Sequence, residues 1–455
     1  SMIFTNAHTP APACAPARLA ILSGVHHTRS GIQNTHWGDG PKWREFPGLE
    51  NIETLEQFFK NRGYKTLGAG KIYHSQAPPW APTSQIEPEN WDFYYPSKYI
   101  SHPYQIRAPK EVIYPKDVHN KSRPGDRDGT GESSWWTWGP IPVSDEKMAD
   151  YQIVDWANYQ LELEHEKPFF LAVGTWKPHD PWEVPQKYFD LYPMEDVVLP
   201  VHKKNDLDDA FDHGRRWIQK WVENNNQWKK VIQSYAAAIS FSDAMLGRLI
   251  DKIKKSSYAD NTIIVLWSDH GMHMGEKENI EKFTLWERST RVPLILSFPK
   301  VIQPGSRCNQ PVSLMDIYPT LVELTGFEKP DHLDGNSLVP QIKDPNTLTS
   351  PVISSYQFSW TNKPYGAHAV RSLNHRYIYY PEVGLEELYN HQTDPNEWHN
   401  VAYNPINKKI IENHRKLLLE MLPELTWEIQ TPKGYTINDK GNIYVQDYLE
   451  LSELK

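Results

Sequence analysis

Three uninterrupted apolar runs constrain the fold of this chain more than any other feature. They read PFFLAVGT at 168–175, TIIVLW at 262–267 and VPLILSF at 292–298. Short continuous apolar runs are typical of strands buried in a parallel sheet. The segments 144–161 and 227–254 carry helical patterns. Strands that alternate with helices predict a doubly wound α/β fold.

The remaining segments predict smaller elements. IETLEQFFKNR at 52–62 predicts a helix, and YKTLGAG at 64–70 predicts a short strand. Residues 77–143 are rich in Pro, Trp, Tyr and Gly and predict long ordered loops. The residues expected on the inward face of the 227–254 helix are Trp228, Val231, Tyr235, Ile239, Met245, Leu246, Leu249 and Ile253.

The sequence changes character after DGNSLVPQIKDP at 334–345. Short strand-like pieces follow and predict a small antiparallel sheet, with a helix near 406–421. We therefore predict a catalytic α/β domain over 1–345 and an α+β subdomain over 346–455.

Composition excludes several classes of protein. The 455 residues include 48 Lys and Arg against 57 Asp and Glu, a net charge of −9, which argues against a nucleic-acid-binding protein. No apolar stretch is long enough to span a membrane. The two cysteines cannot form a disulfide framework. The 18 Trp residues would suit a carbohydrate cleft, although core packing is the more common use of any one Trp.

Polar clusters follow three of the predicted strands. GKIYH ends at residue 74, WKPHD covers 176–180, and SDHG covers 268–271. Ligands of open α/β sheets bind outside the carboxyl ends of the strands. These three clusters therefore predict one site at one edge of the sheet.

Cys14 lies close to the cation of Arg18 in CAPARLAILSG, residues 14–24. A nearby cation lowers the pKa of a thiol and makes it reactive. The alternative is a buried small side chain with an unrelated arginine, and Cys14 and Arg18 alone favour that alternative.

The wider pattern around Cys14 resembles the signature of type I sulfatases, in which a cysteine is oxidised to formylglycine. GKIYH resembles the family segment in which a lysine and a histidine face the sulfate, here Lys71 and His74. Their spacing is similar to that of the iduronate-2-sulfatase branch. WKPHD resembles the Lys-Pro-His loop of the family, with Lys177 and His179.

SDHGMHMGEKENIEK at 268–282 resembles the metal-binding turn of the family. The resemblance implies that Asp269 and His270 bind a divalent cation, usually Ca²⁺, and that Lys282 binds sulfate. His273 is expected to be only a neighbour of the site. The implied fold is that of the alkaline phosphatase superfamily: a large mixed, mostly parallel sheet between helices, with a smaller C-terminal antiparallel sheet.

The same resemblance implies a nucleophilic mechanism. One hydroxyl of hydrated formylglycine at position 14 attacks sulfur while Arg18 holds the nucleophile. His179 protonates the leaving alcohol, and His74 takes part in deprotonating the second hydroxyl so that sulfate is expelled. The side chains implied to bind the sulfate are Lys71, Lys177 and Lys282.

One part of the family pattern is missing from the sequence. Family members begin with a strand that ends in two metal-binding aspartates, whereas the 13 residues before Cys14 include no Asp or Glu. We expect the chain to be an N-terminally shortened form of a longer enzyme. The alternative is a natural remnant that binds metal poorly, because two ligands hold a hard cation weakly.

These patterns predict a sulfuric ester hydrolase acting on a sulfated sugar of a glycosaminoglycan or an algal polysaccharide. A formylglycine-dependent phosphate or phosphonate monoester hydrolase and a metal-deficient carbohydrate-binding relative are the alternatives. The implied partners are the sulfated carbohydrate and a formylglycine-generating enzyme, without nucleic acid or a membrane span. Family analogy implies export to the periplasm, the medium or the lysosome.

Overall fold

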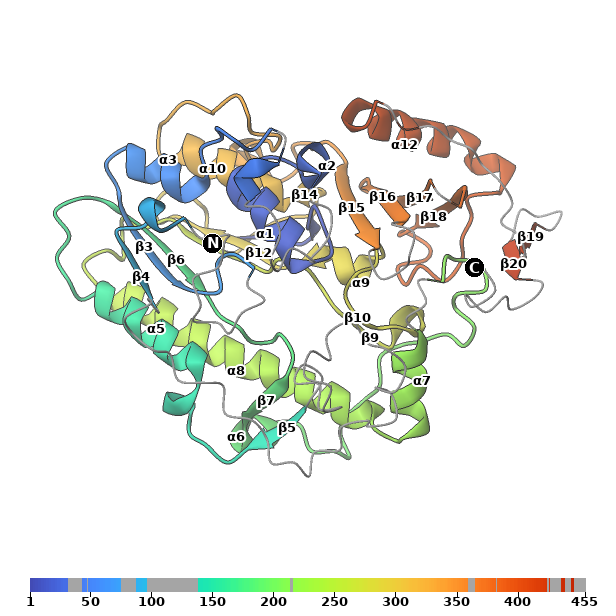
Figure 1. Cartoon of the computed structure of the whole chain (residues 1–455), viewed down its shortest axis with the longest axis horizontal. Helices are drawn as coiled ribbons and strands as arrows, with labels where there is room; N and C mark the ends of the chain where they lie inside the picture. Colours follow the sequence, from blue (N-terminus) through green and yellow to red (C-terminus); the bar gives the residue numbers. More distant parts are fainter. Residues whose placement is uncertain are drawn as a thin grey trace. The chain divides into compact units, whose positions relative to one another are not determined.

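The computed structural model describes most of the chain in two compact units (Figure 1). Unit 1 consists of residues 1–55, 201–217 and 262–455, and unit 2 consists of residues 56–200 and 218–261. The described residues are 1–31, 43–46, 48–74, 87–95, 138–212, 216–358, 365–381, 383–423, 425, 435–437 and 443–445. Most of the loops predicted at 77–143 therefore lie outside the described residues.

The central sheet of unit 2 is parallel. β3 (Lys65–Gly70) lies between β4 (Phe93–Tyr95) and β6 (Phe169–Gly174), and both neighbours run parallel to it. The predictions of strands at 64–70 and 168–175 are confirmed. β6 is half-buried along its length, although its apolar run predicts a buried strand. α5 (Ala149–Gln160) packs on β3 and β6.

The predicted long helix is confirmed as α8 (Trp228–Lys255), which packs against α5. The prediction that Ile239 lies on the inward face is wrong, because Ile239 is 44% exposed. Ala237 and Ala238 are fully buried in its place, because small side chains let the helix approach its neighbours closely. The buried face is therefore rotated from the one that bulky residues alone predict.

The other elements of unit 2 are short. The helix expected at 144–161 is divided between η3 (Asp145–Lys147) and α5. A second, two-stranded parallel sheet joins β5 (Trp138–Ile141) to β7 (Trp182–Pro185). The remaining elements assigned mainly to unit 2 are α3 (Leu55–Asn61), η2 (Pro88–Asn90), α6 (Gln186–Phe189) and α7 (Arg216–Asn224).

Unit 1 contains a mixed sheet in the order β13–β1–β12–β8. Its members are β13 (Ser306–Cys308), β1 (Met2–Phe4), β12 (Leu294–Ser297) and β8 (Ile264–Trp267). The strands predicted at 262–267 and 292–298 are confirmed, but they pair antiparallel. This pairing fits the expected mixed sheet, and it is antiparallel because the chain returns from β8 to β12 without a long crossover helix.

The return from β8 to β12 consists of short elements that carry part of the site. They are β9 (His273–Met274), η4 (Glu276–Glu278), β10 (Ile280–Glu281) and α9 (Glu287–Thr290). β11 (Arg291–Val292) then joins β2 (Ala7–His8) and β14 (Val312–Ser313) in a small sheet.

Helices pack on this part of unit 1 around an apolar core. α1 (Cys14–Ser23) contacts α2 (His27–Ser30), η5 (Leu314–Asp316) and α10 (Ile317–Leu324). η1 (Trp43–Glu45) and α11 (Val339–Lys343) complete the set. Core residues from the strands and α1 include Met2, Phe4, Ile21, Leu294 and Leu296.

The C-terminal antiparallel sheet is confirmed. It has the order β15 (Val352–Phe358), β16 (Tyr365–Arg371), β17 (His375–Tyr380), β18 (Leu385–Asn390). η6 (Pro405–Asn407) leads into α12 (Lys408–Met421), which packs on β16, and β19 (Tyr435–Ile437) pairs with β20 (Ile443–Val445). The domain boundary near residue 345 remains a prediction.

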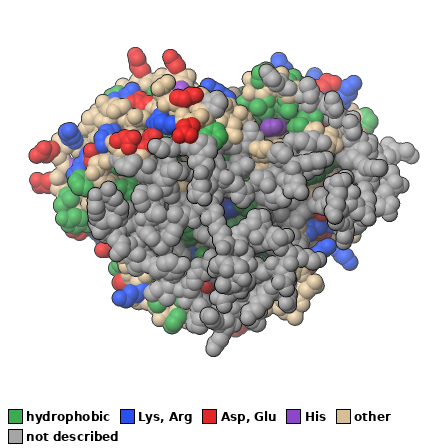
Figure 2. All heavy atoms as spheres, in the orientation of Figure 1, with side chains coloured by type: hydrophobic (Ala, Val, Ile, Leu, Met, Phe, Trp, Pro, Cys, Tyr) green, Lys and Arg blue, Asp and Glu red, His purple; other side chains and the backbone are tan. Residues whose placement is uncertain are grey.

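The surface carries charges of both signs, as the composition predicts. Acidic and basic side chains are interspersed among the described residues on the face shown in Figure 2. None of the helices in the described ranges is both long enough and apolar enough to cross a membrane. Several Trp residues, including Trp176, Trp182 and Trp286, are buried, so these three serve packing and not an exposed carbohydrate platform.

Candidate active site

Cys14 is the first residue of α1 and is 1% exposed. Alanines favour the helix, and Pro16 is tolerated because it lies in the first turn, where backbone N–H groups have no partner within the helix. Gly24 ends the helix in the left-handed conformation, with a φ of 74°. The sequence thus places the cysteine at a fixed helix start.

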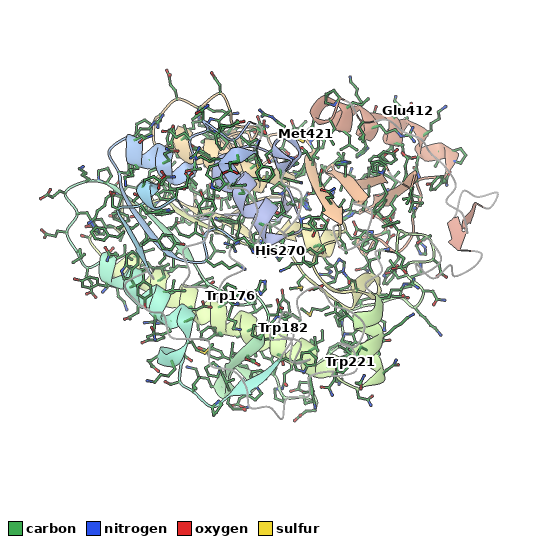
Figure 3. The ribbon with its side chains drawn as sticks, in the orientation of Figure 1. Trp176, Trp182, Trp221, His270, Glu412 and Met421 are labelled. Atoms are coloured by element: carbon green, nitrogen blue, oxygen red, sulfur yellow. The ribbon has the colours of Figure 1, made fainter. Side chains whose placement is uncertain are left out.

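Asp269 and His270 lie in the turn that follows β8 (Figure 3 labels His270). Gly271 completes this turn, and its N–H donates to Ser289 O at 2.8 Å. A Cβ atom on Gly271 would lie 2.0 Å from Arg288 O. Only glycine therefore allows the turn to lie this close to α9.

The structure brings five predicted residues together in unit 1. Cys14 Sγ lies 3.1 Å from His270 Nε2, and Lys282 Nζ lies 3.5 Å from the same sulfur. Arg18 Nε donates to Asp269 Oδ2 at 2.6 Å. His270 Nδ1 faces Gly271 O at 2.9 Å, which assigns the ring proton to Nδ1 and directs the Nε2 lone pair at Cys14.

Lys282 is held by a hairpin whose own histidine is structural. Phe283 N–H donates to Pro12 O at 3.1 Å, which joins the hairpin to the segment before Cys14. His273 Nε2 lies 2.8 Å from Thr284 Oγ1. Burial lowers the pKa of His273 to about 4. His273 is therefore neutral at physiological pH, and the prediction that it only neighbours the site agrees with these contacts.

Three of these side chains could also bind a cation. The ligand atoms of Cys14, Asp269 and His270 lie within 4.8 Å of one another. A carboxylate oxygen and an imidazole nitrogen suit a divalent cation, and an oxygen at position 14 would add a third hard donor. The described donors therefore fit one side of a cation's coordination shell, and Arg18 already holds one oxygen of Asp269.

Unit 2 places its predicted residues on two loops at one edge of its parallel sheet. Lys71 follows β3, and the loop that carries Lys177 and His179 follows β6. Because Gly70 and Gly174 are partners in the parallel register, both loops leave the same edge of this sheet. Lys71 Nζ lies 4.4 Å from the ring centroid of Trp176, a cation–π contact. His74 is half-buried beyond Lys71.

Two aspartates that the sequence reasoning missed shape the 176–182 loop. Asp150 on α5 is buried and accepts the N–H groups of Trp176 and Lys177 at 2.7 and 2.8 Å. Asp180 Oδ1 lies 2.8 Å from His179 Nδ1 and so orients the ring. The position of Asp180 directly after His179 could have predicted its contact with the histidine. No local sequence feature predicts the contacts of Asp150.

Lys177, predicted to bind sulfate, contacts a backbone carbonyl of its own loop. Its ammonium is buried and donates to Pro181 O within the loop. Ser242 of α8 donates to Lys177 O at 3.0 Å. These contacts give Lys177 a part in holding the loop's shape, and its predicted sulfate contact stays a prediction.

Two family models match the chain. One is described as Sulfatase and matches residues 1–327; the other is described as N-sulphoglucosamine sulphohydrolase, C-terminal, and matches residues 275–424. A "Sulfatase" of Formosa agariphila is 35% identical over 452 residues, covering 97% of this chain and 84% of its own.

Human iduronate 2-sulfatase is 27% identical over 384 residues, covering 72% of this chain and 64% of its own. A choline-sulfatase of Rhizobium meliloti has a similar identity, 28% over 428 residues, covering 88% of this chain and 75% of its own. The iduronate-2-sulfatase branch is therefore not singled out.

Solved structures share the fold at low identity. A protein solved with its substrate D-glucosamine-2-N,6-O-disulfate has a TM-score of 0.67 at 19% identity, covering 93% of this chain and 90% of its own. A phosphonate monoester hydrolase of Silicibacter pomeroyi has a TM-score of 0.69 at 18% identity, covering 98% and 93%. At such identities the likeness establishes the fold alone.

Proposed function

The chain belongs to the sulfatase family, and from this premise we propose that it removes sulfate from a sulfated sugar with a formylglycine made from Cys14. The observation that carries the proposal is the convergence of His270 Nε2 and Lys282 Nζ on Cys14 Sγ, at 3.1 and 3.5 Å. A buried cysteine that faces an imidazole and an ammonium is in the position that a nucleophile requires.

Hydrated formylglycine supplies two hydroxyls on one carbon, one to attack sulfur and one whose deprotonation releases sulfate. Lys282 faces this position and stabilises negative charge that develops there. Arg18 holds Asp269 in place through their 2.6 Å ion pair. Asp269 and His270 are the residues that would hold a divalent cation, which we propose to be Ca²⁺; such a cation polarises sulfate oxygens.

The residues of unit 2 complete the proposed roles by family resemblance. We assign to His179 the protonation of the leaving alcohol, because Asp180 holds its ring in a fixed orientation. We assign to His74 the deprotonation of the second hydroxyl. Lys71 and Lys177 are assigned to sulfate binding.

The substrate class rests on the relatives. The C-terminal family model is named after an N-sulphoglucosamine sulphohydrolase, and one structural neighbour was solved with a disulfated glucosamine. A 26% identical relative is an ulvan-active sulfatase, covering 90% of this chain and 74% of its own. These names support a sulfated sugar of a glycosaminoglycan or an algal polysaccharide. Export, and maturation by a formylglycine-generating enzyme, are part of the same proposal.

Two measurements test the proposal. Mass spectrometry of the peptide that contains Cys14, from protein coexpressed with a maturating enzyme, should show conversion to formylglycine. The converted protein should then release sulfate from at least one member of a panel of defined sulfated oligosaccharides, and Cys14→Ala should release none. Full conversion without release from any member would contradict the proposed function.

The phosphonate hydrolase neighbour favours one alternative. Parallel assays with an aryl sulfate and an aryl phosphonate separate the two reactions. A higher kcat/KM for the aryl phosphonate would show that the substrate is a phosphonate monoester and not a sulfate ester.

A further inference from the structure

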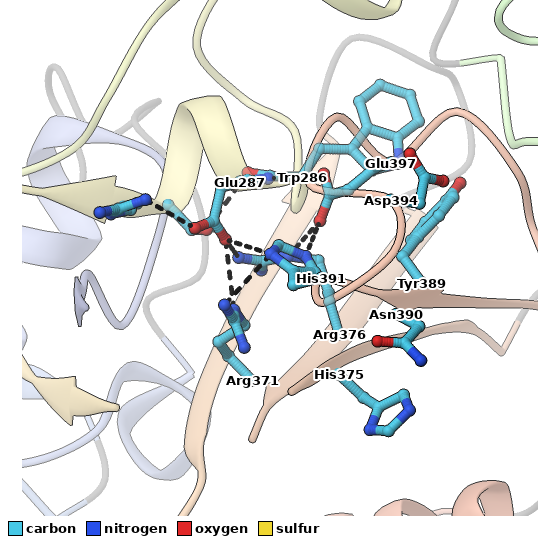
Figure 4. Close-up of polar contacts among 12 residues, drawn as sticks. Trp286, Glu287, Arg371, His375, Arg376, Tyr389, Asn390, His391, Asp394 and Glu397 are labelled. Carbon is cyan, nitrogen blue, oxygen red and sulfur yellow. Dashed lines mark hydrogen bonds and ion pairs between the residues drawn. The ribbon is translucent and has the colours of Figure 1, made fainter. Parts of the chain in front are cut away.

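A buried ionic network joins the C-terminal sheet to α9 (Figure 4). Arg376 on β17 is fully buried at its centre. Its three partners are Glu287 Oε2 at 2.5 Å, Glu397 Oε1 at 2.7 Å and Leu285 O at 2.8 Å. Arg371 on β16 adds a contact from Nε to Glu287 Oε2 at 3.3 Å. One guanidinium thus bridges two carboxylates and a backbone carbonyl.

Arginines neutralise the two carboxylates of the network without any added ion. Glu287, His391 and Glu397 place ligand atoms within 4.8 Å of one another, which resembles a cation site. Burial alone would raise the pKa of Glu397, but Arg376 and His391 outweigh burial and lower it to about 2. The guanidinium groups of Arg371 and Arg376 therefore already balance the two carboxylates, Arg291 adds a third guanidinium 3.5 Å from Glu287 Oε1, and these cations would repel a divalent cation. The cluster is an ionic support and not a metal site.

The element that this network supports is α9. Glu397 Oε2 accepts the N–H of Glu287 at 2.8 Å, which caps the first residue of the helix. The side chain of Glu287 is held at the same time by Arg376 and Arg371. Both the backbone and the side chain of the first α9 residue are therefore fixed by the C-terminal sheet and the loop that follows it.

The other end of α9 accepts hydrogen bonds from two segments of the unit 1 site, the turn after β8 and the segment before Cys14. Ser289 O accepts the N–H of Gly271 at 2.8 Å, next to Asp269 and His270 in sequence. Thr290 O accepts the N–H of Thr9 at 2.9 Å, in the segment that leads to Cys14. A displacement of α9 would therefore move the metal-binding turn and the approach to the nucleophile together.

We propose, on the premise of the sulfatase function above, that Arg376 is a positioning residue for the reaction. It fixes α9 through Glu287 and Glu397, and α9 fixes the backbone on which Asp269, His270 and Cys14 lie. An arginine is required because its planar fork presents donors in several directions at once. A lysine keeps the charge, but its donors all leave one nitrogen atom, so it does not reproduce the separate contacts of Nε, Nη1 and Nη2.

The test compares Arg376→Lys with Arg415→Lys in the full chain. Arg415 is a matched control because it makes a two-contact ion pair with Glu386, at 2.7 and 2.5 Å, in the same C-terminal region. This ion pair joins α12 to β18. Hydrogen exchange is measured at the Gly271 and Thr9 amides and kcat is measured on the converted enzyme.

Arg376→Lys should speed exchange at the Gly271 and Thr9 amides by about tenfold or more, because their acceptors are no longer fixed. Its kcat should fall by about tenfold with KM changed less than about twofold. Arg415→Lys should leave both exchange rates and kcat near those of the wild type. Glu397→Gln, which keeps an acceptor for the Glu287 N–H, should shift exchange in the same direction by less.

Unchanged exchange at Gly271 in Arg376→Lys would overturn the proposal, even if the protein were less stable. Equal effects of Arg376→Lys and Arg415→Lys would also overturn it, since a general loss of sheet stability would then explain both. The exchange measurement needs no turnover, so a failure of the proposed sulfatase function leaves this comparison decisive.

Discussion

Gly271 is a residue at which the geometry of the site tolerates little change. Replacement by alanine would place a Cβ atom 2.0 Å from Arg288 O, a backbone atom that cannot move away cheaply. We therefore expect Gly271→Ala to displace Asp269 and His270 and to lower kcat by about a hundredfold, in line with the sensitivity of catalysis to misplacements of about 1 Å. Steady-state sulfate release measures this.

The control for this prediction is Gly247→Ala. Gly247 lies inside α8 with no atom near the position of an added Cβ. Alanine there should keep full activity and raise the stability by about 0.5–1 kcal/mol, because glycine weakens a helix interior. Equal activity of the two variants would contradict the tight contact at Gly271.

Lys282 provides a second test at the scale of single residues. It is buried and its ammonium faces Cys14 Sγ. Lys282→Met removes this charge while keeping much of the side-chain volume, so kcat should fall about a hundredfold, the usual cost of losing one donor that stabilises developing charge.

Lys187→Met is the matched control for Lys282, because Lys187 is 62% exposed and pairs with Asp145 on the surface. Its activity should match the wild type. A Lys282→Met enzyme with the same kcat as the wild type would remove Lys282 from the mechanism.

Among the secondary-structure elements, α5 shows how a helix shapes a distant loop. Both carboxylate oxygens of Asp150 accept N–H groups of the 176–182 loop. In Asp150→Asn, an amide NH₂ would replace one acceptor and face a backbone N–H. The variant should lose about 1–3 kcal/mol of stability, the cost of an unsatisfied buried donor, and should lose activity because His179 moves.

Asp155→Asn on the same helix is the control for Asp150. Asp155 pairs with Arg248 at 3.1 Å and is 65% exposed. Exposed pairs contribute less than about 1 kcal/mol, so this variant should unfold at nearly the wild-type urea concentration. A smaller loss in Asp150→Asn than in Asp155→Asn would refute the role of the buried carboxylate.

The element scale also separates what the sequence could predict from what it could not. Strands β6, β8 and β12 were predictable because each is an apolar run with clear ends, and β3 because a short strand-like segment follows the helix predicted at 52–62. Their pairing was not, since the antiparallel partnership of β8 and β12 depends on the short elements between them. Ile239 was misplaced because the burial of Ala237 and Ala238 follows from packing and not from side-chain size.

The site divides in the same way. Cys14, Asp269 and Lys282 could be assigned from motifs because a motif preserves local spacing. Asp150 and Arg376 could not, because neither is close in sequence to the residues that it supports. Their roles depend on hydrogen bonds and ion pairs that only the folded chain forms.

At the scale of the whole molecule, buried histidines control how stability depends on pH. Burial lowers the pKa of His26, His273 and His368 to about 4 and lowers the pKa of two others, His8 and His27, well below 6.5. Between pH 6.5 and 4 the unfolded chain therefore binds protons that the folded chain does not. Each such histidine removes about 1.4 kcal/mol of stability per pH unit as the pH falls.

Buried carboxyl groups with a raised pKa act in the opposite direction. Burial raises the pKa of Asp316 to about 6 and of Glu387 to about 7, so the folded chain holds these protons at a pH where the unfolded chain has lost them. They add stability as the pH falls toward 4. The pKa of Asp206 is also raised by burial, and the pKa values of His332, His375 and His414 are also lowered by burial. Because the histidines with a lowered pKa outnumber the carboxyl groups with a raised pKa, we expect the net stability to decrease from pH 6.5 to pH 4.5.

His368→Gln isolates one of these contributions. Glutamine can keep a hydrogen bond to Ser355 Oγ, which lies 2.8 Å from His368 Nδ1, but it does not titrate. Urea unfolding between pH 5 and 6 should show a pH slope that is shallower than that of the wild type by about 1.4 kcal/mol per pH unit. His202→Gln, a substitution of an exposed histidine, should leave the slope unchanged. An unaltered slope in His368→Gln would mean that His368 takes up its proton in the folded chain, and its buried contact with Ser355 would then have to open on acidification.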